Sequence, residues 1–237
     1  GGILKAATDN GVTDLISVTG RQINEVEPLI RAVEGIFSPS SGIVDSHSLM
    51  LSLVGEIEDL SGSVVGNTLV TRVIPDASGF KVVMEIERDE YVLHSRCVVN
   101  SAGLGAQNVA KQIEGFPVSE IPQLHLCKGS YFSMHGKSPF KHLIYPVPPA
   151  RGDGLGVHAT IDLSGSVKFG PDVEYVDCED YSVSASKVDN FHSAISRYFP
   201  SIKIDRLTGA YSGIRPKLQG PSDAFKDFCI NDGVNID

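Results

Sequence analysis

The stretch VVNSAGLGA at residues 98–106 constrains the fold of this chain more than any other. Apolar residues run into a small-residue turn that contains Gly103 and Gly105, and residues that favour a helix follow. A buried strand entering such a turn is typical of the nucleotide-contacting edge of an α/β protein, because glycines let backbone N–H groups approach a phosphate. A complete G-x-G-x-x-G motif would need a glycine where the chain has Asn108. The sequence therefore predicts the second half of a nucleotide site.

Both ends of the sequence favour an internal piece of a longer polypeptide. The chain begins at Gly1 and enters a predicted helix that Asn10 and Gly11 would end in a left-handed cap. The first residues lack the basic, apolar and small-residue succession of a signal peptide. We expect a strand at residues 228–230 and no closing helix before Asp237. The alternative is a complete protein with a processed N-terminus.

The composition excludes several classes of protein. With 237 residues, 41% of them hydrophobic, the chain can bury the core of one large domain or of two interleaved ones. A net charge of -9 argues against a nucleic-acid partner, although local cations remain able to bind an anionic small substrate. Apolar runs fall short of the ~20 residues of a membrane span, so we expect no transmembrane segment. The four scattered cysteines predict no zinc site and no disulfide framework, and they favour a reducing compartment.

The periodicity of apolar residues predicts a mixed α/β (α+β) fold. Helical spacing is followed by a meander of short strands, then by proline-rich alternating segments typical of an antiparallel sheet with one working face. The expected elements, in order, are a helix over 45–60, strands over 68–74, 80–86, 91–93 and 98–100, a helix over 106–113, strands over 129–134, 142–147, 155–161 and 166–169, a helix bearing Val188, Phe191, Ile195 and Tyr198 on one side, and a strand over 211–218.

Arg215 is the first candidate for a ligand-binding side chain. It follows Ile214 and precedes Pro216, which removes a backbone donor and holds Arg215 in an extended conformation. A guanidinium on such a stiff backbone suits a bidentate grip on a carboxylate. The alternative is a surface arginine at the end of a strand.

His158 and Tyr145 are the next candidates. On a strand over 155–161 side chains alternate, so Leu155, Val157, Ala159 and Ile161 would share the apolar face. Gly156, His158 and Thr160 would share the other face, which leaves room for a ligand above the imidazole. Histidine titrates near neutrality and is suited to act as a general base, unless it is only a hydrogen-bonded structural residue. Tyr145, among prolines, either presents its hydroxyl to a ligand or packs at a domain edge. The remaining histidines show no metal-site spacing.

Seven stretches, taken together, resemble the FAD-dependent oxidoreductases of the D-amino-acid oxidase type, in the family's order. They span residues 38–45, 98–106, 128–132, 143–148, 154–160, 168–174 and 211–217. The resemblance is greatest to the branch that oxidises L-2-hydroxyglutarate to 2-oxoglutarate by hydride transfer to FAD. It implies a partial, Rossmann-like FAD-binding domain over 46–115 and 213–237, interleaved with an antiparallel-sheet substrate domain over 1–45 and 116–212.

The resemblance also implies roles for individual residues. Arg215 and Tyr145 would bind the 2-hydroxy acid substrate, and His158 would be the catalytic base. A lysine would meet the second carboxylate, without a choice among Lys128, Lys168 and Lys217. The electron acceptor stays open, and a eukaryotic source would imply a mitochondrial location. The residues implied to contact FAD are Val70, Asn100, Ser101, Ala102, Gly103 and Gly105.

Two departures from the family pattern keep alternatives open. Members of the family open with a strand and a G-x-G-x-x-G turn and close with a glycine-rich flavin segment, and the sequence contains neither. One alternative is an amino-acid or amine oxidase of the same superfamily. The other is a truncated, non-catalytic domain that cannot hold FAD.

Overall fold

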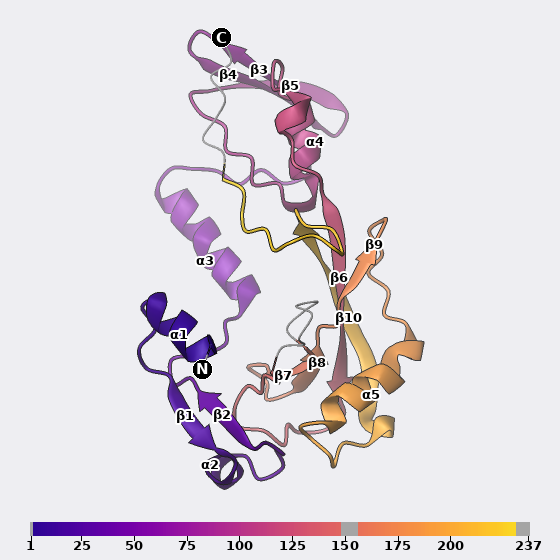
Figure 1. Cartoon of the computed structure of the whole chain (residues 1–237). Helices are drawn as coiled ribbons and strands as arrows, with labels where there is room; N and C mark the ends of the chain where they lie inside the picture. The colour runs from indigo at the N-terminus through magenta and orange to yellow at the C-terminus, as the bar shows by residue number, and fades with distance from the viewer. Residues whose placement is uncertain (1, 148–155, 231–237) are drawn as a thin grey trace. The chain divides into compact units, whose positions relative to one another are not determined.

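The computed structural model describes residues 2–147 and 156–230, which fall into two compact units (Figure 1). Unit 1 comprises Gly1–Ser46, Lys128–Glu174 and Asp180–Ile214. Unit 2 comprises His47–Cys127, Tyr175–Glu179 and Arg215–Asp237. Leu155, which belongs to the expected strand over 155–161, lies outside the described residues, as do Pro148 and Gly154 of the quoted stretches.

Unit 1 opens with the expected helix and continues with a hairpin that the sequence analysis missed. Gly11, at the end of the first helix, has a φ of 80°, which confirms the left-handed cap. Thr19 caps the second helix by accepting from the backbone N–H of Gln22, whose side chain bonds back to the Thr19 N–H. The elements are α1 (Gly2–Asp9), β1 (Ile16–Thr19), α2 (Gly20–Val26) and β2 (Glu34–Phe37), with β1 antiparallel to β2.

An antiparallel sheet supplies the framework of the candidate site. Its strand order is β10-β6-β8-β7, and β9 pairs with β6. Helix α5 covers one face of the unit 1 part of this sheet (Figure 1). The elements are β6 (His125–Met134), β7 (His158–Ile161), β8 (Val167–Gly170), β9 (Glu174–Val176), α5 (Val188–Ser196) and β10 (Leu207–Lys217).

The hydrophobic core of unit 1 lies between α5 and the covered face of this sheet. Phe191 and Ile195 are buried at the spacing that the sequence predicts for one side of the helix. The ring of Phe191 lies 4.5 Å from that of Phe132 on β6, measured between centroids. Ala159, the middle of the expected apolar face of β7, is fully buried in the same core. Burial of these side chains packs one face of the sheet against the helix, so the polar side chains of the strands lie on the opposite face.

Unit 2 contains the helices predicted over 45–60 and 106–113 and the meander of short strands predicted over 68–93. Strands β3, β4 and β5 pair in order as an antiparallel sheet, and a parallel bridge joins Val73 of β3 to Ile113. The elements are α3 (Ser46–Asp59), β3 (Thr68–Asp76), β4 (Gly79–Ile86), β5 (Asp89–Ser95), the 3₁₀ turn η1 (Gly103–Gly105) and α4 (Ala106–Lys111). The remaining 3₁₀ turns are η2 (Val118–Glu120), η3 (Ala185–Lys187) and η4 (Ile204–Arg206).

Three expected strands are corrected by the structure. Residues 97–102 have no regular secondary structure, and Val99 is 81% exposed, because no strand of the described chain pairs with them. Residues 228–230 are likewise unpaired and exposed. Within 142–147 only Ile144 makes a ladder contact, an isolated antiparallel bridge to Ala159. Apolar composition predicts a strand, but ladder hydrogen bonds define one.

Candidate functional site

The open face of the unit 1 sheet gathers the polar side chains of β6, β7 and β8. Register places Lys168 of β8 between Ser133 of β6 and Thr160 of β7. Since side chains alternate along a strand, His158, paired with Gly170, points to the same face as Thr160. Position 170 does not accept a side chain. An added Cβ would lie 2.7 Å from the Tyr131 ring, and the φ of Gly170 is 145°. The ring of Tyr131 therefore covers Gly170 and reaches the row of His158.

His158 is the least exposed polar side chain of this face. It is 7% exposed, and its Nδ1 is buried without a hydrogen-bond partner in the described part of the chain. The Ile144–Ala159 bridge brings Tyr145 beside it, with ring centroids 4.6 Å apart. Burial lowers the pKa of His158 below its ordinary value of 6.5, so the imidazole is neutral at pH 7. A neutral, unpaired and buried imidazole can hold or accept a proton from a ligand.

Tyr131 and Tyr211 form a stacked pair on the same face. Their ring centroids lie 4.6 Å apart at an interplanar angle of 14°. The Nζ of Lys168 lies 5.3 Å from the centroid of the Tyr211 ring, a distance at which a cation is attracted to an aromatic face. Burial raises the pKa of Tyr131, and charge repulsion from Tyr211 and Tyr145 raises it further. Tyr131 is therefore a neutral hydroxyl donor at pH 7.

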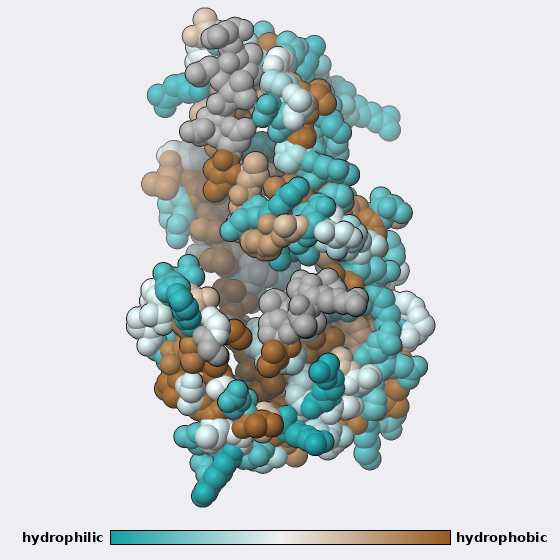
Figure 2. Space-filling model, in the orientation of Figure 1, coloured by the Kyte–Doolittle hydropathy of each residue, from teal (hydrophilic) through white to brown (hydrophobic). Residues whose placement is uncertain are grey.

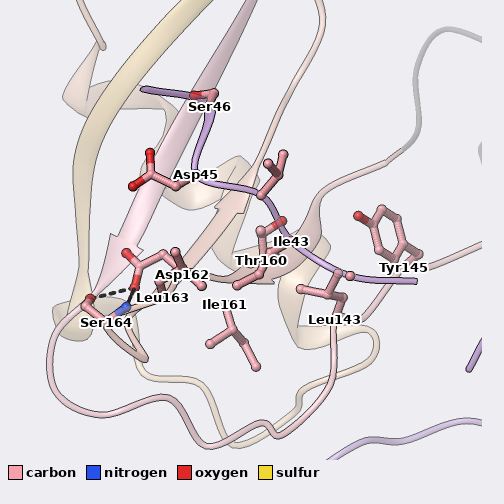
Figure 3. Close-up of a pocket in the computed structure, with 12 residues that line it drawn as sticks. Ile43, Asp45, Ser46, Leu143, Tyr145, Thr160, Ile161, Asp162, Leu163 and Ser164 are labelled. Atoms are coloured by element: carbon pink, nitrogen blue, oxygen red, sulfur yellow. Dashed lines mark hydrogen bonds between the residues drawn. The ribbon is translucent and has the colours of Figure 1, made fainter. Parts of the chain in front are cut away.

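A hollow of about 510 Å³ adjoins this face and lies entirely within unit 1. Figure 3 shows the segment that carries Ile43 and Asp45 running between Asp162 and Tyr145. Thr160 and Tyr145 belong both to the hollow and to the open face. The hollow is within the 300–1,000 Å³ range of small-molecule sites. Its lining residues are Gly42, Ile43, Val44, Asp45, Ser46, Leu143, Tyr145, Thr160, Ile161, Asp162, Leu163 and Ser164.

A second hollow, of about 360 Å³, lies in unit 2 around the 98–102 segment. Valines of β3, β4 and α4 form its apolar wall. Asn100 fixes the loop, since its Nδ2 donates to the Ala106 carbonyl at 2.8 Å and its Oδ1 accepts from the Ala102 N–H at 3.3 Å. Asn100 thus shapes the segment and leaves ligand contacts to the backbone. The lining residues are Val70, Val73, Val82, Val98, Val99, Asn100, Ser101, Ala102 and Val109.

Similarity to known proteins identifies the family. The sequence model of the family described as "FAD dependent oxidoreductase" (DAO) matches residues 3–233. The chain belongs to this family.

Relatives and solved structures of the family agree with the fold. The chain is 37% identical to "L-2-hydroxyglutarate dehydrogenase, mitochondrial" of Arabidopsis thaliana, over 96% of this chain and 55% of that protein. It is 31% identical to the protein of that name from Pongo abelii, over 68% of this chain and 40% of the other. FAD-bound L-alpha-glycerophosphate oxidase from Mycoplasma pneumoniae superposes with a TM-score of 0.71 at 17% identity, covering 91% of this chain and 57% of that chain. The chain therefore spans about half the length of the proteins it matches.

The two hollows fit the cofactor of this family to different degrees. Four of the six residues expected to contact FAD line the unit 2 hollow: Val70, Asn100, Ser101 and Ala102. Gly103, with a φ of 56°, and Gly105 form the 3₁₀ turn that follows. An apolar wall beside an ordered loop suits the flat ring of a nucleotide base. In unit 1, His158 does not line the hollow, but its Nδ1 has no hydrogen-bond partner among the described residues, so a group bound against the imidazole would supply the missing bond.

The cationic residues expected at the site are spread over both units. Lys168 lies on the open face of unit 1. Lys128 points to the covered face, buried, with its Nζ 2.9 Å from Asp180. Lys217 belongs to unit 2, with its Nζ 5.5 Å from the centroid of the Tyr175 ring. Arg215, also in unit 2, is exposed and makes no ion pair with the described residues.

Sequence reasoning missed Tyr131 and Tyr211, although both belong to stretches that resemble the family. A signal was present at Tyr131, because it alternates with Ser130 and Phe132, which are buried on the covered face. The alternation assigns Tyr131 to the open face as soon as β6 is recognised as a strand. No local pattern indicates the stacking on Tyr211, which depends on the pairing of two strands that are distant in sequence.

Among the described residues, the structure shows no group of three or more histidine, cysteine, aspartate or glutamate side chains placed to hold a metal ion. It likewise places no helix there that is both long and apolar enough to cross a bilayer.

Proposed function

We propose that this chain provides the substrate face, and part of the cofactor site, of a flavin-dependent dehydrogenase that oxidises a 2-hydroxy acid, most concretely L-2-hydroxyglutarate to 2-oxoglutarate. The observation that carries this proposal is His158, whose imidazole is buried and neutral and whose Nδ1 has no hydrogen-bond partner among the described residues. Oxidation of a hydroxyl group requires a base for the hydroxyl proton, and this face offers one. The names of the relatives supply the substrate class.

The proton is handled by the chain itself. A hydroxyl group bound against the His158 side chain donates to the imidazole and leaves its proton there as the substrate carbon is oxidised. When bound, FAD supplies the acceptor for the hydride that leaves this carbon. Tyr145, whose ring lies beside His158, orients the imidazole and presents a hydroxyl donor to the substrate. Exclusion of water from His158 keeps the base unprotonated at pH 7.

The other proposed contacts follow from residue chemistry. Arg215 would bind the C1 carboxylate, because its guanidinium is exposed and engages no partner in the described chain. FAD would contact the unit 2 hollow through Val70 and the backbone of residues 100–103, with Gly105 shaping the turn. A mitochondrial location is proposed only by extension from the eukaryotic relatives, since relatives from Escherichia coli also exist.

An amine oxidase of the same family is the second candidate, because solved neighbours include a glycine oxidase from Geobacillus kaustophilus with a TM-score of 0.67. That similarity, at 17% identity, shows the fold alone. An amine substrate does not require the same base, so the two candidates differ in their dependence on His158. A non-catalytic domain that binds no FAD is the third candidate, and it predicts a colourless protein.

The decisive experiment compares substrates and variants of the FAD-loaded protein. We expect flavin bleaching by L-2-hydroxyglutarate and none by glycine, sarcosine or D-alanine. Arg215→Ala should lose about 1.5–3 kcal/mol of substrate binding, a fall of roughly ten- to a hundredfold in kcat/KM. Arg96→Ala removes an exposed arginine of the same unit and serves as the control. Bleaching by an amine alone, or equal kinetics of Arg215→Ala and the wild type, would refute the proposal.

A further inference from the structure

The cation on the open face differs from other lysines of unit 1 in how its ammonium is bonded. Lys187 donates to Asp172 at 2.7 Å and to Glu174 at 2.6 Å, and Lys128 donates to Asp180 at 2.9 Å. Lys168, by contrast, makes no hydrogen bond in the described part of the chain. Its nearest carboxylate oxygen is Asp162 Oδ2 at 3.6 Å, which is beyond hydrogen-bonding range. The N–H donors of Lys168 are therefore available to a ligand, and its side chain is 35% exposed.

Asp162 is committed to the turn that follows β7. Its Oδ1 accepts from the N–H and hydroxyl of Ser164 and from the Ser166 N–H, at 2.6–3.0 Å. The hydrogen bond from the Ser164 side chain is the main cause that lowers the pKa of Asp162. Since the carboxylate is held in this turn, it balances the charge of Lys168 from a distance without occupying its donors.

The stacked tyrosines hold Lys168 over the open face. The Tyr211 ring lies 5.3 Å from the ammonium, and Tyr131 stacks on this ring with a centroid distance of 4.6 Å. Thr160, paired with Lys168 across the β7–β8 ladder, adds a hydroxyl next to it. The arrangement is a cation with free donors, flanked by hydroxyl groups, which is the chemistry that recognises a carboxylate.

The spacing between this cation and the proposed base fits a dicarboxylic substrate. His158 and Thr160 are two residues apart on β7, so the row of Lys168 is roughly 7 Å from that of His158. A short carbon chain with a hydroxyl near one end and a carboxylate at the other spans that interval. A hydroxy acid with one carboxylate has no group to place at Lys168.

We infer that Lys168, held over the Tyr211 ring, is the specificity-determining residue that binds the distal carboxylate of a dicarboxylic 2-hydroxy acid. The inference rests on the proposed function of the same face, and it selects Lys168 from the three lysines that the sequence leaves open. Lys128 is excluded by its burial and its bond to Asp180.

The test removes the positive charge of Lys168 and measures the binding of two ligands that differ by one carboxylate. Binding of 2-oxoglutarate and of 2-oxobutyrate to the FAD-loaded protein is measured by isothermal titration calorimetry. We expect Lys168→Met to lower the affinity for 2-oxoglutarate at least tenfold and to change the affinity for 2-oxobutyrate less than twofold. Lys168→Arg should keep most of the preference, because it keeps the charge. Lys203→Met, an exposed lysine of unit 1, is the matched control and should change neither affinity.

Turnover of L-2-hydroxyglutarate and L-2-hydroxybutyrate with an artificial electron acceptor separates this inference from the proposed function. If the wild type oxidises L-2-hydroxyglutarate and Lys168→Met weakens both ligands equally, or neither, the inference is overturned while the function stands. If the wild type oxidises no 2-hydroxy acid, but the Lys168→Met substitution selectively weakens the binding of 2-oxoglutarate, the proposed function fails and the proposed carboxylate subsite stands. A wild type that binds 2-oxoglutarate no better than 2-oxobutyrate overturns the inference outright.

Discussion

The two units place their apolar residues in opposite ways. In unit 1 a continuous core joins α5 to the sheet, and Phe132, Phe169 and Phe191 are almost fully buried. In unit 2 the apolar side chains along α3 are exposed, and Figure 2 shows apolar surface over this helix. Burial there is concentrated at β3 and β4, in Val73, Val82 and Val83.

This difference explains why the two candidate sites have different chemistry. A sheet with one face sealed by a helix can hold its other face rigid, so unit 1 presents side chains in fixed positions. His158 can then remain buried and unpaired, because the core behind it fixes the strand. Unit 2 offers a wall of valines and an ordered loop, which recognise shape and backbone contacts rather than charge. Side-chain chemistry is therefore expected in the unit that has the larger core.

The largest expected effect comes from opening the core of unit 1. Phe191→Ala should lower the free energy of unfolding by about 3–5 kcal/mol, because it removes a buried ring that contacts Phe132 and leaves a cavity. Leu53→Ala on α3 is the matched apolar deletion in unit 2, and its side chain is exposed. It should change stability by less than about 0.5 kcal/mol. Urea denaturation followed by circular dichroism measures both, and equal losses would remove the distinction between the units.

The buried carboxylate of Glu27 should have the next largest effect. Its Oε1 accepts from the backbone N–H groups of Lys141 and His142 at 2.7 and 2.8 Å and lies 2.9 Å from His142 Nδ1. These bonds tie α2 to the segment that leads to Tyr145. Glu27→Ala leaves buried N–H donors without an acceptor and should lower the free energy of unfolding by about 1–3 kcal/mol.

Glu25→Ala is the control for Glu27, because it removes an exposed carboxylate paired with Arg21 on the same helix. Such surface pairs contribute about 0–1 kcal/mol. Thermal denaturation should therefore separate the two variants by several degrees. Equal melting temperatures would mean that the core of unit 1 is insensitive to its buried charge.

Local signals in the sequence predicted much of this fold. The 3.6-residue spacing of Phe191 and Ile195 predicted a helix with one buried side, and the alternation around His158 predicted which face of β7 it occupies. Both patterns depend only on near neighbours in the sequence. Gly11 was likewise predictable as a left-handed cap, because its conformation is set by the residues beside it.

Features that depend on distant partners could not be predicted. Residues 98–100 have the composition of a strand, but the described chain places no strand beside them, so they remain irregular. The environments of the lysines were also hidden. Lys128 and Lys168 are equally plausible as carboxylate binders in sequence, and only the pairing of Lys128 with Asp180, 52 residues away, distinguishes them. The stack of Tyr131 on Tyr211 depends on strand pairing in the same way.

The smallest expected effect is a pH dependence of stability that arises in unit 1 from His158. Burial lowers its pKa in the folded state, whereas the unfolded chain has the ordinary value of about 6.5. Above pH 6.5 the imidazole is neutral in both states and the folded protein keeps its full stability. As the pH falls below 6.5, the unfolded state takes up a proton that the folded state does not, so stability is lost until the folded pKa is passed.

His158→Gln removes this group and keeps a polar side chain on the open face. The drop in melting temperature between pH 7.5 and pH 5.5 should therefore be smaller in His158→Gln than in the wild type, and the NMR titration of the wild-type imidazole should have its midpoint below 6.5. A wild-type midpoint above 6.5 would show that the imidazole is paired or solvated, and the argument that His158 is a neutral base would fail with it. The midpoint distinguishes a paired imidazole from a buried one, because pairing with an acid raises the pKa of a histidine, whereas burial lowers it.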